Sequence, residues 1–296
     1  TKKIFFFLLL TVVLLFPASS YAATKEEHDE AYTLYAAAGG CLAAYSDRIG
    51  KLAYEYFEDD GWEIQPFASS TVQADARFIF LKKTFVEDGQ VFYMLAIVGT
   101  ETVKDVKVDL RVDNVYCESK TPEEFTQNAQ LKNIPDTLPK VHRGFHQYVE
   151  AAVAAKTVDS DGNSKSLAEL LLAYPNRKVY LVGHSLGGAA AIIAGARLIN
   201  TGVNPNQIEV ITFGSPAVGN EAFEKKKKKV LPLTRVVISG DMVTGVLQKL
   251  VGGYKQFGRE IRWQLPNIID SGPHGMSQYL DLAMKNYYRV MQRAVE

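Results

Sequence analysis

The sequence predicts an α/β fold with a mostly parallel central sheet and helices on both faces. The apolar run from Val179 to Val182 is nearly continuous rather than alternating, which is typical of a strand buried on both faces. An Ala-, Leu- and Ile-rich run from Leu186 to Leu198 follows it directly and predicts a buried helix, with Gly202 just beyond its end. Residues 23–296 are enough for one large α/β domain with a substantial core.

Three further apolar runs extend this sheet. Val91 to Val98 predicts a long strand that ends at a Gly-Thr turn. "VITF" and the run from Arg235 to Ser239 predict two more strands, and the latter ends at a Gly-Asp turn. By contrast, the polar stretch from Thr157 to Ser166 predicts a surface loop between two helical stretches.

The junction between the strand and the helix carries the pattern G-x-S-x-G, centred on Ser185. A direct strand-to-helix turn forces the residue at its tip into a strained conformation. Gly183 and Gly187 lack a Cβ and so allow close packing around that turn. This arrangement predicts a nucleophile elbow, in which the Ser185 hydroxyl is exposed and the next backbone N–H points toward whatever approaches it.

A serine hydroxyl needs a neighbouring base, and proteins with such an elbow place the acid and then the histidine after the serine. His274 is the only histidine after Ser185, so we expect it to be the base. Asp241 is the best-placed acid, because it follows a strand at the carboxyl end where sites of open α/β sheets lie. Asp270 is the alternative. The other acids in the interval lie before a strand, beside lysines or inside a strand: Glu209, Glu221, Glu224 and Glu260.

Negative charge that develops on a substrate carbonyl oxygen needs preorganised N–H donors. We expect one donor to be the backbone N–H of Leu186, directly after the nucleophile. The turn after the strand that ends at Val98 offers a second, from Thr100, and Gly99 lets the chain turn sharply there.

Four stretches, in this order, resemble the fungal-type class 3 lipases, a branch of the α/β-hydrolases. They are "AIVGTETVKDVKVDL", "VHRGF", "VGHSLGGAAA" and "ITFGSPAVGN", and the resemblance spans about Tyr56 to Tyr279. It implies the α/β-hydrolase fold, with Ser185, Asp241 and His274 as the catalytic triad. It also implies Thr100 and Leu186 at the oxyanion hole, in agreement with the positions reached from chain order and strand ends.

In this family the segment after the oxyanion turn forms a lid. Here Glu101 to Leu110 alternates charged residues with small apolar ones, so it offers an oil surface little apolar area. An insertion-like stretch, Arg111 to Pro139, follows and is the alternative cover for the site.

The N-terminus predicts export. Lys2 and Lys3 precede an apolar run from Ile4 to Phe16, and small residues follow up to Ala22, as in a bacterial-type secretory signal peptide over residues 1–22. The run is shorter than the roughly 20 residues of a spanning helix. We therefore expect a secreted or periplasmic protein.

The remaining composition excludes several classes of function. The formal charge is +0 at pH 7, which gives no reason to expect nucleic-acid binding. No cluster has metal-ligand spacing and no Gly-rich loop is suited to phosphate, so we expect neither metal nor cofactor. Cys41 and Cys117 are consistent with one disulfide or with two buried thiols. The lysine run from Lys225 to Lys229 is typical of a solvated helix face, and contact with anionic lipid headgroups is the alternative.

These observations together predict a serine hydrolase of carboxylic esters, with a lipase that cleaves acylglycerols as the first candidate. The alternatives are a phospholipase A1, a short-chain esterase or a feruloyl esterase. A non-catalytic lipid-binding module on the same fold is a rival of a different class. We expect a monomer whose partner is a lipid or another ester substrate.

Overall fold

The computed structural model describes residues 22–71, 74–85, 91–98, 114–146, 149, 156–158, 162–245, 253–266 and 272–294. The predicted signal peptide, Gly99, Thr100, the segment from Glu101 to Leu110 and Asp270 lie essentially outside these ranges.

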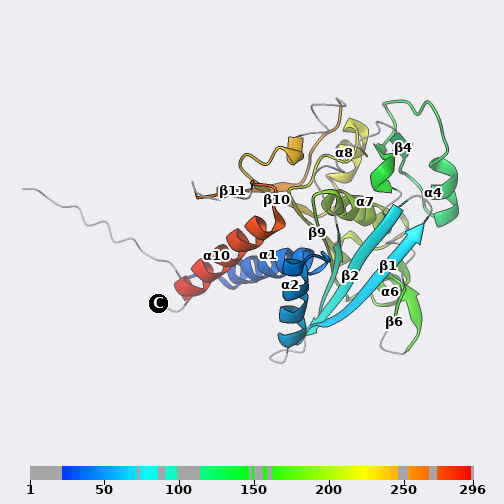
Figure 1. Ribbon diagram of the computed structural model, residues 1–296. Coiled ribbons are helices and arrows are strands. Elements are labelled where there is room, and N and C mark those ends of the chain that lie inside the picture. The colour runs from blue at the N-terminus through cyan, green and yellow to red at the C-terminus, as the bar shows by residue number, and fades with distance from the viewer. Residues whose placement is uncertain are drawn as a thin grey trace, which may run out of the picture.

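A central sheet organises the described chain (Figure 1). Strand β3 pairs in parallel with β8, β8 with β9, β9 with β10, and β10 with β11, whereas β1, β2 and β3 pair antiparallel. The sheet is therefore mostly parallel, as predicted. Its strands, in spatial order, are β1 (Glu63–Thr71), β2 (Ala74–Thr84), β3 (Val91–Ile97), β8 (Val179–His184), β9 (Ile208–Phe213), β10 (Leu233–Ile238) and β11 (Arg259–Trp263).

Helices cover both faces of this sheet, which confirms the predicted layers. One face packs against α1 (Lys25–Ala43), α2 (Arg48–Asp59) and α10 (Met276–Ala294). The other packs against α6 (Leu167–Ala173), α7 (Leu186–Asn200) and α8 (Glu221–Lys227). The short elements are α4 (Pro122–Asn128), the 3-10 turn η1 (Pro205–Gln207), and two small two-stranded sheets, β4 (Asn114–Tyr116) with β5 (Lys140–His142) and β6 (Lys156–Val158) with β7 (Ser164–Ser166).

Alternating side chains of the strands divide the core into two layers. In β2, Phe78 and Phe80 face the α7 layer, whereas Ile79 and Leu81 face the α1 layer. Successive strand side chains point to opposite faces, so a strand covered by helices on both faces is apolar at every position. This is why the buried strands read as continuous apolar runs in the sequence.

Two segments differ from the sequence-based expectation. Thr157 to Ser166 contains a hairpin, in which β6 pairs antiparallel with β7, rather than a plain loop. Its strands are short and polar, so they lack the apolar alternation that marks a half-buried strand. The described part of the insertion packs at the far end of α7 from the elbow, where the Cys117 carbonyl accepts a hydrogen bond from Asn200 Nδ2 at 3.2 Å. It is therefore not placed as a cover over Ser185.

The two cysteines are free and buried, so the disulfide alternative is wrong. Cys41 lies in the α1 layer of the core, and Cys117 lies in the α7 layer. The central sheet separates the two thiols. A disulfide requires Cα atoms within about 7 Å, which this arrangement does not allow.

The lysine run is largely neutralised by glutamates. Lys225 and Lys228 pair with glutamates one turn earlier on α8, and Lys226 and Lys227 both reach Glu118. Lys227 is almost fully buried rather than solvated. The run therefore offers a lipid surface less free positive charge than its composition suggests.

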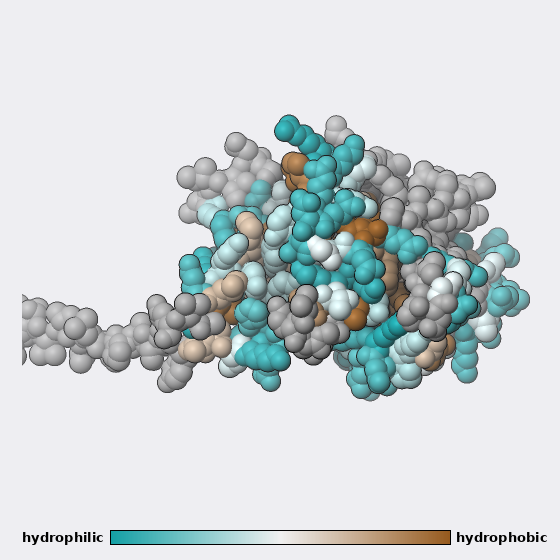
Figure 2. Space-filling view, turned by 90° about the horizontal axis from the view of Figure 1, so that it is seen from below, coloured by the Kyte–Doolittle hydropathy of each residue, from teal (hydrophilic) through white to brown (hydrophobic). Residues whose placement is uncertain are grey.

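The surface in Figure 2 is mainly hydrophilic, and its hydrophobic side chains form small separate groups. Within the described chain, no helix has the length and apolar character needed to cross a membrane.

Candidate active site

The elbow forms as the sequence predicts. Ser185 lies between the end of β8 and the start of α7, with φ 56° and ψ −123°, a strained conformation for a residue with a side chain. A Cβ on Gly183 would lie 2.2 Å from the Gly187 carbonyl oxygen, and one on Gly188 would lie 2.8 Å from the Ser215 Cβ. Only glycine fits positions packed this closely, so these residues allow β8 to turn directly into α7.

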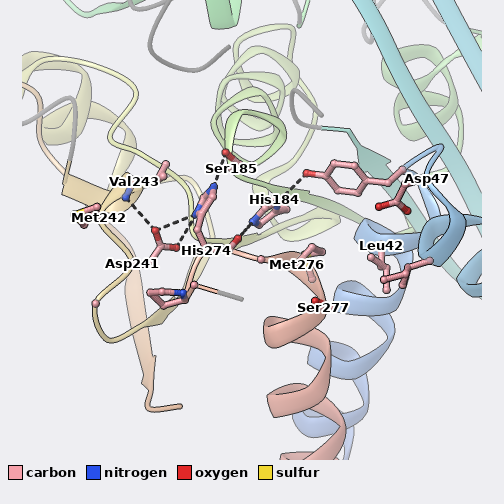
Figure 3. Close-up of a pocket in the computed structure, with 16 residues that line it drawn as sticks. Leu42, Asp47, His184, Ser185, Asp241, Met242, Val243, His274, Met276 and Ser277 are labelled. Carbon is pink, nitrogen blue, oxygen red and sulfur yellow. Dashed lines mark hydrogen bonds and ion pairs between the residues drawn. The ribbon is translucent and has the colours of Figure 1, made fainter. Parts of the chain in front are cut away.

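Ser185, His274 and Asp241 form a continuous chain of hydrogen bonds (Figure 3). The Ser185 Oγ lies 3.0 Å from His274 Nε2, and His274 Nδ1 lies 2.9 Å from Asp241 Oδ2. A carboxylate only accepts hydrogen bonds, so Nδ1 carries the proton and the Nε2 lone pair faces the serine hydroxyl. An imidazole in this state is able to take the hydroxyl proton.

The three residues come from the ends of neighbouring strands. Ser185 follows β8, and Asp241 follows the turn after β10. His274 lies between β11 and α10. The sheet order β8-β9-β10-β11 thus brings together residues that are 89 and 33 positions apart in the chain.

The Asp241 carboxylate is fully buried, and it accepts hydrogen bonds from three donors. His274 Nδ1–H donates to it, Tyr279 O–H donates to Oδ2 at 2.7 Å, and the Val243 N–H donates to Oδ1 at 3.0 Å. Burial, followed by the negative charge of Asp241, raises the pKa of Tyr279, so its phenol stays protonated and remains a donor. The hydrogen bonds to Asp241 offset the cost of burying its charge.

Gly214 packs directly beneath this carboxylate with φ +60°. A Cβ at this position would lie 2.6 Å from Asp241 Oδ2 and 3.0 Å from the Tyr279 hydroxyl. Its N–H donates to the Val236 carbonyl of β10 at 3.0 Å. Glycine is therefore required there by both space and backbone conformation.

A second chain of hydrogen bonds holds His274 from the other side. His184 Nε2 lies 2.7 Å from the His274 carbonyl oxygen, and the Tyr45 hydroxyl lies 2.7 Å from His184 Nδ1 (Figure 3). Burial, and next the neighbouring His274, lower the pKa of His184 to about 3, so its ring is neutral at ordinary pH. A carbonyl only accepts, so His184 donates from Nε2 and accepts from Tyr45 at Nδ1.

The predicted oxyanion donors are only partly described. Leu186 is the first residue of α7, where a backbone N–H has no intrahelical acceptor. Among the described residues, the Ser185 side chain caps no N–H of this helix, so its hydroxyl is directed to His274 instead. Thr100 lies outside the described residues, and its role stays a prediction.

The other described acids of the interval have structural partners away from Ser185. Glu209 pairs with Lys178, and Glu260 pairs with Arg235 and Arg262. Glu221 and Glu224 pair with lysines of the run. Sequence reasoning did not find Tyr279, Tyr45 or the role of His184, because these contacts join residues far apart in the chain.

A cavity of about 500 Å³ opens at the triad. Its lining combines Ser185 and His274 with mainly apolar neighbours: Leu42, Tyr45, Ile49, Met242, Val243, Pro273 and Met276. Within the described chain, no group of histidine, cysteine, aspartate or glutamate side chains is arranged to hold a metal ion. The site therefore places an imidazole and a serine hydroxyl at the wall of an apolar pocket.

A family model described as "Lipase (class 3)" matches residues 94–250, slightly more than half of the chain. The chain belongs to the class 3 lipase family. Its α/β-hydrolase fold is shared with the crystal structure of a lipase from Rhizopus microsporus var. chinensis, at a TM-score of 0.57 and 24% identity, over 86% of this chain and 78% of that one.

Two relatives of this class 3 lipase are similar to it in sequence over shorter stretches. A lipase of Caenorhabditis elegans is 46% identical over 72 residues, which are 24% of this chain and 20% of the worm protein. A secreted mono- and diacylglycerol lipase of Gibberella zeae is 31% identical over 146 residues, which are 46% of this chain and 32% of the fungal protein. The chain thus spans between a fifth and a third of the length of these two relatives.

Proposed function

We propose that the chain is a serine hydrolase that cleaves carboxylic esters, with acylglycerols as its substrates. The observation that carries this proposal is the hydrogen-bond chain from Ser185 through His274 to Asp241 at an apolar cavity. The names of the worm lipase and the fungal mono- and diacylglycerol lipase support the choice of substrate class.

In the proposed reaction, Ser185 Oγ attacks the ester carbonyl carbon while His274 Nε2 takes its proton. His274 then gives this proton to the leaving alcohol, which leaves the acyl group on Ser185. Asp241 holds the imidazole in the required tautomer and stabilises its positive charge. Water attacks the acyl-enzyme with His274 again as base, which releases the acid and restores the serine.

The oxyanion in this scheme is stabilised by the N–H of Leu186 and by Thr100. The Leu186 N–H follows the nucleophile at the helix start, where the helix dipole also favours negative charge. No cofactor enters the scheme.

Labelling with a fluorophosphonate probe tests whether Ser185 is an activated nucleophile. We expect stoichiometric labelling of the wild-type protein and none of Ser185→Ala, which fits the same turn and keeps the fold. Loss of a triad member lowers turnover by several orders of magnitude. Labelling of Ser185→Ala, or a tenth of the wild-type activity in the pure variant, contradicts the assignment.

A substrate panel then defines the ester class. Tri-, di- and monoacylglycerols, phosphatidylcholine, short-chain nitrophenyl esters and methyl ferulate are compared at matched concentrations. The proposal expects the highest kcat/KM on an acylglycerol. A preference for the sn-1 ester of the phospholipid, or for the ferulate, identifies a phospholipase A1 or a feruloyl esterase instead. A protein that neither hydrolyses any of these esters nor reacts with the probe is a binding module.

We also propose that the protein is exported as a monomer. The run from Ile4 to Phe16 supports export, and so does the name of the secreted fungal relative. N-terminal sequencing of protein recovered from the periplasm or the medium tests this proposal, with a mature start after Ala22 as the expected result. A chain that retains Lys2 and Lys3 contradicts cleavage at that position.

A further inference from the structure

Helix α2 carries an apolar stripe that the fold leaves uncovered. Ile49, Leu52 and Tyr56 are 52%, 56% and 55% exposed. Their spacing of i, i+3 and i+7 places them on one side of the helix, along about 10 Å of its length. Large apolar side chains exposed singly are ordinary, but an aligned group of three on one helix marks a contact surface.

The helix itself is held firmly, so the stripe has a fixed position. Its N-cap Asp47 accepts a hydrogen bond from the Gly50 N–H at 2.7 Å. Phe57 on the buried side packs so closely on α1 that a Cβ on Gly39 would lie 2.6 Å from its ring. Helix α2 therefore has a buried side, which includes Phe57, and a separate exposed apolar stripe.

The stripe continues into the cavity of the active site. Ile49, at its first position, lines the same cavity as Ser185. Met242 lines that cavity from the opposite side and is 80% exposed. Figure 3 shows Met242 and Asp47, at the start of α2, on opposite sides of the serine and the two histidines. Exposed apolar side chains thus lie on both sides of the cavity mouth.

We propose that the α2 stripe is the surface on which this protein docks on aggregated acyl lipid, with the cavity mouth facing the lipid layer. The inference rests on the proposed function. Whatever covers Ile49 and Met242 also covers the entrance to Ser185. A folded protein partner in that place would close the entrance, whereas a lipid layer supplies the substrate through it.

The polar side of α2 agrees with this orientation. Lys51 and Glu58 lie opposite the stripe and are exposed. They would remain in water while Leu52 and Tyr56 contact the acyl chains.

Two double variants of α2 test the docking surface. Leu52→Gln with Tyr56→Gln removes apolar contact without changing a residue that lines the cavity. Lys51→Gln with Glu58→Gln is the matched control on the other side of the helix. We expect the first to lower hydrolysis of a trioctanoin emulsion by about tenfold, since burial of even one such side chain is worth that factor in binding. Hydrolysis of soluble nitrophenyl acetate stays unchanged, and the control matches the wild type on both substrates.

An equal loss on both substrates contradicts the proposal, because it indicates damage to the site rather than to docking. Full activity of Leu52→Gln with Tyr56→Gln on the emulsion also contradicts it. Thermal unfolding of both variants shows whether the fold is kept.

A labelling experiment tests contact with lipid directly, and it depends neither on catalysis nor on the folding of the two double variants. Both native thiols are buried, so a single cysteine placed at Leu52→Cys in the Ser185→Ala protein is the reactive one. An environment-sensitive fluorophore there is expected to shift to shorter wavelength when trioctanoin droplets are added, whereas the same label at Glu58→Cys does not shift. Labels that respond equally, or not at all, overturn the docking surface. If the wild-type protein hydrolyses no ester but the label at position 52 shifts selectively, the proposed function is overturned alone.

Discussion

The ring of His184 donates a hydrogen bond to the carbonyl oxygen of His274, with 2.7 Å between His184 Nε2 and that oxygen. His184 thus precedes the proposed nucleophile in the chain and also holds the backbone of the proposed base. Its other nitrogen accepts from Tyr45, which belongs to the turn between α1 and α2. Tyr45 therefore helps to position His274 through His184, although Tyr45 and His184 are 139 positions apart in the chain.

Tyr45→Phe is expected to lower kcat on a soluble ester by about tenfold at most, because a neutral hydrogen bond is worth about 1 kcal/mol. The variant keeps the ring but leaves His184 Nδ1 without its donor, so His274 is held less firmly. KM should change less than kcat, which separates positioning of the base from loss of substrate contact. Steady-state kinetics with nitrophenyl acetate measure both constants, and an unchanged kcat contradicts the role.

Asp241→Asn is expected to reduce turnover far more than Asp270→Asn. Asparagine keeps the size of the side chain but favours the wrong imidazole tautomer, an effect that reaches about 10⁴-fold in a triad. Active-site titration and initial rates of both variants provide the comparison. The reverse ranking would transfer the role of the acid to the segment before His274.

Tyr279→Phe is expected to destabilise the protein by about 1–3 kcal/mol, because it removes a buried donor to Asp241. It also removes the acceptor for the Ile238 N–H, which lies 3.2 Å from the hydroxyl. Turnover should fall as well, since the Asp241 carboxylate loses one of its donors. Tyr288→Phe, at an exposed position of the same helix, is the matched control. Urea unfolding and kcat distinguish the two, and equal behaviour of both variants contradicts the prediction.

Because of His184, the free energy of unfolding should decrease as the pH is lowered from about 6.5 to about 3. Its pKa is about 3 when folded, below the ordinary value of an unfolded histidine, so the unfolded chain binds the proton first. Stability is then fully present above the unfolded pKa and is lost as the pH decreases, by about 1.4 kcal/mol per pH unit for one proton. Urea unfolding at several pH values should give a shallower slope for His184→Gln than for the wild type. Equal slopes would show that another group controls this range.

In the Leu52→Gln with Tyr56→Gln protein, which lacks the docking stripe, activity on a medium-chain ester should rise smoothly with concentration and show no jump where droplets form. The segment from Glu101 to Leu110 contributes a few small apolar residues, and burial is worth roughly 25 cal/mol per Å² of apolar area. Opening such a segment gains little at an oil surface. Initial rates of that variant across the solubility limit test this, and a sharp rise there identifies a lid with a larger apolar face.

Strands β3, β8, β9 and β10, helix α7 and the three proposed triad residues were predictable because each leaves a local pattern in the sequence. Parallel strands covered on both faces leave continuous apolar runs, and the elbow and strand ends leave short local patterns at Ser185 and Asp241. Helix α4 was not predicted, although Thr121 before Pro122, with acidic residues in the next turn, is a helix-start signal. This signal lies in a segment with too few apolar residues to suggest a helix.

The supporting contacts of the site have no such local pattern. Tyr279 reaches Asp241 from a helix that begins after His274, and Tyr45 reaches His184 from the turn after α1. Each contact depends on how two elements that are distant in the chain pack together. A tyrosine in the sequence does not by itself indicate which residue its hydroxyl contacts. The requirement for glycine at position 214 likewise arises from the closeness of Asp241 and not from the turn alone.

The two cysteines give the core a pair of internal reporters. Burial raises the pKa of both thiols, so neither reacts with an alkylating reagent while its surroundings stay closed. Cys41 belongs to one layer of the core and Cys117 to the other. The order in which an alkylating reagent reaches them under mild denaturation would therefore reveal which side of the central sheet opens first, without the introduction of any foreign probe.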